Sequence, residues 1–189
     1  MIPGLFTVNA SGKQVFFSKG NLWCDTSVNP GEDNLHLEEH QYDYPTERKP
    51  DHIGHFFWSN DPSVARAASY HDPGRGEHDV FFTNAAEYSA NPDFTVGDIT
   101  GRFRTLSMQE WIYLFDSRSN AKSLYKVHVT VCGKTECLVI APDNYNGGAI
   151  KESYSAEEWQ EAEAQGLVCL PAAGYLYMSN APVQGAGHY

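Results

Sequence analysis

The length and composition of the chain fit a single folded domain with an acidic surface. Its 189 residues are 41% hydrophobic and 13% aromatic, which is enough to build a sizeable core. The formal net charge is −11 at pH 7, and such a surface repels nucleic-acid phosphates and anionic membranes. We therefore expect no nucleic acid among the partners. We also expect no membrane insertion, because no apolar run approaches the roughly 20 residues that span a bilayer.

The strands predicted from the sequence are short and are separated by polar segments. Alternating or continuous apolar runs bounded by turn residues predict strands over residues 5–8, 13–18, 21–24, 40–44 and 167–170. Residues 25–52 are otherwise predicted to be mainly loop, and residues 59–101 form a second long irregular stretch. The aromatic run at 55–58 predicts core packing.

Two stretches, residues 107–111 and 155–159, share the signature Ser-x-x-Glu-Trp. In this capping box the serine hydroxyl accepts from the backbone N–H three residues on, and the glutamate accepts from the N–H of the serine. Each stretch therefore predicts a helix start. The first helix is predicted to carry an apolar stripe of Met108, Trp111, Ile112 and Phe115. Arg118 lies in its last turn, where a cation suits the helix dipole.

The second predicted helix begins at Ser155 and ends at Gly166, a candidate left-handed residue just past the helix. Leu167 follows it at the position that usually supplies the accompanying hydrophobic contact.

Four cysteines are too few to define a disulfide scaffold. Cys132 and Cys137 lie between two apolar runs that predict a β-hairpin, where cross-strand positions could meet disulfide geometry. A disulfide and two reduced thiols both remain open for this pair. Zinc is less favoured, because no second Cys/His pair matches the spacing.

Four phrases, taken in chain order, resemble one known family. They are Glu39-His-Gln-Tyr-Asp-Tyr44, Gly101-Arg-Phe-Arg-Thr-Leu-Ser-Met-Gln-Glu-Trp111, Val139-Ile-Ala-Pro-Asp143 and Leu170-Pro-Ala-Ala-Gly-Tyr175. Together they are similar to C-type-lectin-fold domains of Bacteroidetes and their phages. The resemblance implies an α+β domain over residues 1–189, in which two short helices pack on small twisted antiparallel sheets with long loops.

This is the fold of the formylglycine-generating enzyme and of the variable proteins of diversity-generating retroelements. The variable proteins bind ligands on cell or phage surfaces through a segment after the Ala-Ala-Gly-Tyr turn, which usually continues through Trp-Ser-Ser. This chain ends at Tyr189, where that phrase would begin. A complete domain and a domain lacking its C-terminal strands, and with them the binding face, are therefore both open.

The resemblance implies a non-enzymatic domain that recognises a surface glycan or protein, at a cell surface or on a virion, with no cofactor. The N-terminus lacks the basic and apolar regions of a signal peptide. Tyrosine and asparagine supply contact area and adaptable hydrogen bonds. The candidate ligand-binding residues in the tail are Tyr175, Tyr177, Asn180, His188 and Tyr189, and a frayed terminus is the alternative interpretation.

A second hypothesis is a zinc-dependent hydrolase. The residues 36–40 match H-x-x-E-H, in which His36 and His40 would bind zinc and Glu39 would be the general base. That chemistry requires both histidines on one helix face, and the flanking sequence shows no helical stripe. A third hypothesis is a structural remnant without binding activity.

Other candidate sites are weaker. The pair His52 and His55 beside the aromatic run predicts a structural role, and the Asn-Asp and Asn-Pro-Asp phrases at 60–61 and 91–93 predict turns rather than calcium ligands. A copper oxidase like the formylglycine-generating enzyme would need a cysteine pair near the C-terminus. Cys169 stands alone in that region of the sequence, so the sequence predicts no such activity.

Overall fold

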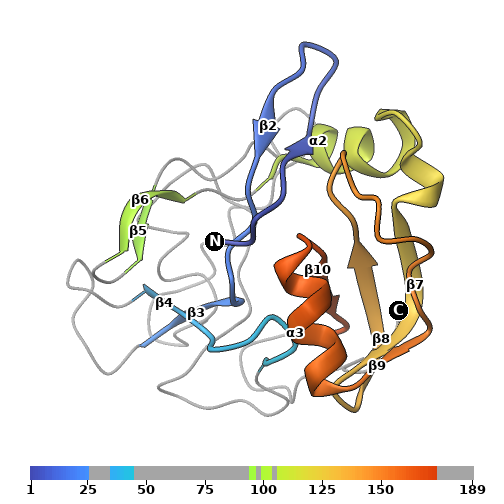
Figure 1. Ribbon diagram of the computed structural model, residues 1–189. Helices are drawn as coiled ribbons and strands as arrows, with labels where there is room; N and C mark the ends of the chain where they lie inside the picture. Colours follow the sequence, from blue (N-terminus) through green and yellow to red (C-terminus); the bar gives the residue numbers. More distant parts are fainter. Residues whose placement is uncertain (26–34, 45–93, 97–98, 104–105, 174–189) are drawn as a thin grey trace, which may run out of the picture.

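A four-stranded sheet forms the centre of the computed structural model, which describes residues 1–25, 35–44, 94–96, 99–103 and 106–173 (Figure 1). Its strands are β7 (Tyr125–Val131), β8 (Lys134–Ile140), β9 (Ser153–Tyr154) and β10 (Val168–Pro171), in the order β10-β8-β7-β9. Strand β8 runs antiparallel to both β7 and β10, and β9 runs parallel to β7. Among the described residues, strand β10 therefore lies at one edge of this sheet.

The hairpin of β7 and β8 confirms the hairpin predicted around the two cysteines. Its turn is tighter than the spacing suggested, because Val131 already pairs with Lys134. The two residues between them, Cys132 and Gly133, have φ angles of 50° and 80°. Positive φ at both central positions is typical of the two-residue turn that matches the twist of a hairpin.

Both faces of the sheet carry buried apolar side chains. Successive side chains along a strand point to opposite faces. One face contributes Val129, Val131, Cys137, Val139 and Cys169 to a buried cluster. The opposite face contributes residues to a second buried cluster, with Ile140 and Val168 at its centre. The sheet is thus the middle layer between two cores, and the described residues form a mixed α+β structure.

Helix α3 (Ala156–Ala164) covers the first face, and Figure 1 shows it beside β8 and β10. The predicted capping box is confirmed: Ser155 Oγ accepts from the N–H of Glu158 at 3.2 Å, and the Glu158 carboxylate accepts from the N–H of Ser155 at 2.8 Å. Trp159 anchors the helix in the core, with only 2% of its surface exposed.

The predicted end of α3 is also confirmed. Gly166 has a φ of 95°, and its N–H donates to the carbonyl of Glu163, while the N–H of Leu167 donates to the carbonyl of Ala162. This pair of bonds is the Schellman arrangement, which satisfies carbonyls at the helix end. A side chain at position 166 would also meet Pro142 at 2.9 Å.

The second face is covered by the N-terminal strands β1 (Phe6–Thr7) and β2 (Gln14–Val15) and by the short helix α2 (Met108–Ile112). Ser107 and Glu110 form the predicted capping box of α2. After Ile112 the helix widens into a π-helical turn, η1 (Tyr113–Ser117), in which the N–H of Arg118 donates to the carbonyl of Tyr113.

The widened turn changes which residues of the first helix are buried. An α-helical period predicted that Ile112 faces the core, but Ile112 is 43% exposed and Leu114 is fully buried instead. A π-helical turn holds more residues than an α-helical one. The predicted stripe is therefore wrong at Ile112, although Trp111 and Phe115 do pack against the second core.

Three smaller elements complete the described residues. They are the pair β3 (Leu22–Cys24) and β4 (Leu35–Leu37), the pair β5 (Phe94–Val96) and β6 (Ile99–Phe103), and the 3₁₀ turn η2 (Ala121–Ser123). The strand predicted over 40–44 is wrong, because these residues form bends and a turn in which the N–H of Asp43 donates to the carbonyl of His40. No helix among the described residues is long and apolar enough to cross a membrane.

Candidate functional site

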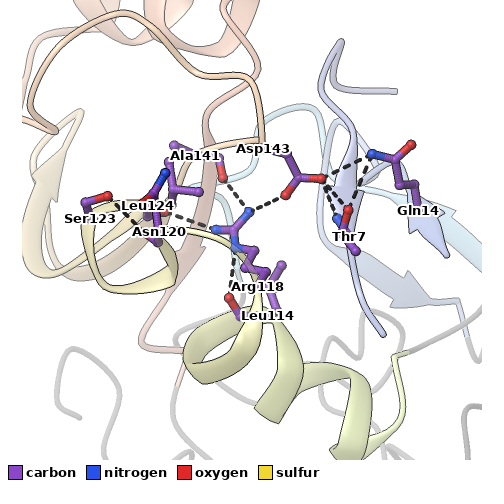
Figure 2. A network of polar contacts seen from close by, with 9 residues as sticks. All are labelled: Thr7, Gln14, Leu114, Arg118, Asn120, Ser123, Leu124, Ala141 and Asp143. Carbon is purple, nitrogen blue, oxygen red and sulfur yellow. Dashed lines mark hydrogen bonds and ion pairs between the residues drawn. The ribbon is translucent and has the colours of Figure 1, made fainter. Parts of the chain in front are cut away.

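A buried arginine joins the widened turn to both ends of the central hairpin (Figure 2). The side chain of Arg118 is 1% exposed. Its Nε donates to the Leu114 carbonyl at 2.9 Å, and its Nη1 and Nη2 donate to the carbonyls of Ala141 at 2.9 Å and Leu124 at 3.3 Å. Leu124 precedes β7 and Ala141 follows β8, so one guanidinium holds the two strand ends together.

The π-helical turn makes this arrangement possible. In an α-helix the N–H of Arg118 would bond the carbonyl of Leu114, four residues back. Here that N–H bonds Tyr113 instead, and the Leu114 carbonyl accepts from the side chain of Arg118. The guanidinium thus replaces the backbone donor that the widened turn removes.

Asp143 extends the network to the N-terminal hairpin. Its Oδ1 accepts from Arg118 Nη1 at 3.2 Å, while its Oδ2 accepts from the N–H and the hydroxyl of Thr7 at 2.8 and 2.7 Å. Gln14 Nε2 donates to the same Oδ2 at 3.2 Å, as Figure 2 shows. Three segments far apart in the sequence therefore meet at the ion pair of Arg118 and Asp143. Both the guanidinium and the carboxylate are hydrogen-bonded to other groups of the protein.

The pKa of Asp143 reflects this environment. Burial raises the pKa, but the hydrogen bonds from Thr7, Gln14 and Arg118 outweigh burial and leave the pKa below its ordinary value of 3.8. A carboxylate whose pKa is lower in the folded chain stabilises the fold at pH values above the unfolded pKa. That stabilisation disappears as the pH falls through the folded pKa.

We therefore expect Asp143→Asn to flatten the acid limb of the stability curve. The parent should lose stability between about pH 5 and pH 2 as Asp143 is protonated, whereas the variant should start less stable and lose less over that range. Urea midpoints followed by tryptophan fluorescence at several pH values measure the slope. An unchanged slope in the variant would contradict this assignment.

The H-x-x-E-H motif does not lie on a helix. His36 is in strand β4 and its ring is tilted against that of Trp23, with centroids 4.5 Å apart. His40 lies in a bend and stacks on Tyr42 at a centroid distance of 4.9 Å. Glu39 is exposed and lies 3.9 Å from the ring of His40. The one-sided pair of histidines that the hydrolase hypothesis requires is therefore not formed.

Among the residues that the structure describes, no group of three or more His, Cys, Asp or Glu side chains is placed to hold a metal ion. The other candidates lie outside the described residues, namely His52, His55 and the phrases at 60–61 and 91–93.

Cys132 and Cys137 are free thiols, so the disulfide considered for this pair is not present. The reason lies in the strand register. Cys132 occupies the turn itself, and a bulge at Glu136, with a φ of 58°, places Cys137 opposite Val129. The two cysteines are therefore not cross-strand partners.

Strand β10 is held on both of its sides, on one side just past its last residue and on the other at its second residue. On the inner side the N–H of Ala172 donates to the carbonyl of Glu136 at 3.2 Å. On the outer side the N–H of Cys169 donates to the side-chain oxygen of Gln41, which is 2% exposed. Asn21 Nδ2 holds the segment of Gln41 by donating to the carbonyls of Gln41 and Asp43 at 2.6 and 2.7 Å.

The C-terminal end of this anchored strand is the candidate functional site, because a tyrosine-rich segment follows it in the sequence. The candidate binding residues Tyr175, Tyr177, Asn180, His188 and Tyr189 lie outside the described residues. Comparisons with protein-family models, curated proteins and solved structures found no match to this chain. The functional argument therefore depends on the geometry of the scaffold and on the sequence of the tail.

Sequence reasoning missed two of the residues that build this scaffold. Asp143 and Gln41 both lie in phrases that carried the family resemblance, but neither shows a local signal of its role in the sequence. Arg118 was assigned to the helix dipole, and it does bond a helix carbonyl. Its contacts with Ala141 and Asp143 join segments more than twenty positions away, which helical periodicity cannot predict.

Proposed function

We propose that this chain is a ligand-binding domain with a C-type-lectin-like fold, displayed on a cell surface or a virion. It recognises a surface glycan or protein without catalysis. The observation that carries the proposal is the anchored end of β10, where Glu136 and Gln41 fix the strand just before the tyrosine-rich tail.

The rest of the scaffold supports this role. A binding surface gains affinity when its supporting strands are already ordered, because less conformational entropy is lost on association. The Arg118–Asp143 network and the two capping boxes supply such order without leaving a charged group of the network free for a substrate. Tyrosine and asparagine side chains then provide contact area and hydrogen bonds on top of it.

Replacing Tyr177 or Tyr175 with alanine tests the proposal. The labelled chain is first applied to an array of bacterial surface glycans and to intact bacterial cells. Each variant is expected to lose roughly tenfold or more in affinity for whatever the parent binds, as is typical of aromatic anchors in an interface. Phe16→Ala is the matched control, because Phe16 is 50% exposed on the N-terminal hairpin. Equal binding by all three variants would overturn the assignment of the site.

The alternatives predict different results. A zinc-dependent hydrolase requires stoichiometric zinc in the purified chain that is lost in His40→Ala, and elemental analysis of both proteins detects it. If the chain is a structural remnant, it should bind neither the array nor the cells. A version of the chain extended at its C-terminus should bind them.

A further inference from the structure

Two buried thiols lie next to each other on neighbouring strands of the central sheet. The register of β8 and β10 pairs Cys137 with Pro171 and Val139 with Cys169. Cys137 and Cys169 are therefore offset by two residues, and both belong to the buried cluster on the α3 face. Diagonal neighbours on one face of an antiparallel pair are about 7–8 Å apart, so the two thiols lie on the same face and on adjacent strands.

The two thiols are chemically unequal. A hydrogen bond from Cys169 lowers the pKa of Cys137, with help from a backbone bond at Val131 and against the effect of burial. The same hydrogen bond and burial raise the pKa of Cys169. The thiolate is the nucleophile in disulfide chemistry. Cys137 is therefore the sulfur that attacks an external disulfide first, and Cys169 is the sulfur that attacks second, at Cys137.

The third described cysteine has a different environment. Cys132 lies in the hairpin turn and is partly exposed, and burial raises its pKa even though Tyr42 bonds its side chain. Its thiol lies 3.9 Å from the carbonyl of Ser155. Cys132 also packs against the buried cluster that contains Cys137 and Cys169, but it lies in the turn and is not paired with β10 in the strand register.

We propose that Cys137 and Cys169 form a redox-active dithiol, which closes to an intramolecular disulfide between β8 and β10 by exchange with a low-molecular-weight disulfide such as oxidised glutathione. Cys137 is 0% exposed, so the exchange takes place when this face of the sheet opens locally. The Cys137 thiolate then attacks one sulfur of oxidised glutathione, and the glutathione S–S bond breaks to release one glutathione thiolate. Cys169 then attacks the Cys137 sulfur of the mixed disulfide; the bond between Cys137 and glutathione breaks, and the proton of the Cys169 thiol passes to the leaving glutathione sulfur. The two cysteines are oxidised by two electrons, and their two protons leave with two molecules of reduced glutathione.

Closure of this bond changes the sheet. Diagonal neighbours have Cα atoms about 7–8 Å apart, whereas disulfides most often join Cα atoms about 5.5–6 Å apart. Strand β10 must therefore move toward Cys137, and a disulfide formed against such resistance is readily reduced. Because β10 leads to the tyrosine-rich tail, the redox state of the pair alters the support of the proposed binding segment.

The experiment uses the full native chain in buffers that contain a series of reduced-to-oxidised glutathione ratios. Free thiols are alkylated, and tryptic peptides are mapped by mass spectrometry without reduction. Trypsin separates all four cysteines, since it cleaves after Lys19, Lys126, Lys134 and Lys151. We expect a crosslinked pair of peptides that contains Cys137 and Cys169, formed at oxidising ratios and lost at reducing ones.

Other patterns would overturn the proposal. One such result is full alkylation of Cys137 and Cys169 after incubation in oxidised glutathione alone, because it shows that both thiols stayed free. A disulfide that joins Cys137 to Cys132 or Cys24 is the second. Cys132→Ser is the control and is expected to keep the crosslink, whereas its loss in that variant would show that the pair does not react directly. None of these readouts involves ligand binding, so their failure leaves the proposed function untouched.

Discussion

Replacing Arg118 with methionine is expected to destabilise the chain by at least about 3 kcal/mol, the cost of breaking a buried, hydrogen-bonded charge pair. The variant leaves the carbonyls of Leu114 and Ala141 without their side-chain donor. It also leaves Asp143 without the cation that it faces. The free energy of unfolding, measured in urea by tryptophan fluorescence, reports the loss.

Two further variants distinguish the effect of the buried guanidinium from the effect of losing any positive charge. Lys122→Met removes an exposed cation that pairs with Asp116, and exposed ion pairs contribute little to stability. Its unfolding midpoint should stay close to that of the parent. Arg118→Lys keeps the charge but lacks the planar fork of donors, so it should fall between the parent and Arg118→Met. Equal stability of Arg118→Met and Lys122→Met would show that the network is not structural.

Truncating Trp159 to alanine is expected to cost about 3–5 kcal/mol, the range for removing a large aromatic side chain from a core. Trp159 is 2% exposed and meets the ring of Tyr154 edge to face at a centroid distance of 5.4 Å. Trp159 and Ala162 are the residues that α3 buries in the core, so the loss of the larger of them should also reduce the helical signal in circular dichroism.

A matched pair of variants tests the same contact more finely. Gln160→Ala changes the next residue, which is exposed on α3, and should alter stability by less than about 0.5 kcal/mol. Trp159→Phe should cost much less than alanine, because among the described residues the buried Nε1 of Trp159 has no hydrogen-bond partner to lose. A small effect of Trp159→Ala would mean that α3 is held elsewhere.

The elements that the sequence predicted well are those whose cause is local. Ser107 and Ser155 begin helices because each bonds a backbone group three residues away, so the pattern can be recognised from the sequence alone. Gly166 ends α3 because its own backbone takes a positive φ. The β7–β8 hairpin was likewise predicted from two apolar runs with a short turn between them.

The predictions that were wrong depend on contacts between distant segments. Ile112 is exposed because the helix widens after it, and the widened turn is stabilised by Arg118, whose partners lie on the hairpin. Residues 40–44 form no strand. The backbone carbonyl of Gln41 accepts from the Asn21 side chain, and its side-chain oxygen accepts from the N–H of Cys169. Cys137 lies diagonally across from Cys169 through a strand register that no spacing in the sequence encodes. The ligand-binding residues of the tail remain a prediction.

The contact between Gln41 and β10 also bears on how the chain behaves at high concentration. An edge strand with open N–H and carbonyl groups is a template on which another chain can add a strand, and this is a common route to aggregation. At Cys169 the outward N–H is already taken by the Gln41 side chain. Within the described part of the sheet, one amide oxygen thus occupies a backbone donor of β10 to which a second molecule could otherwise add a strand.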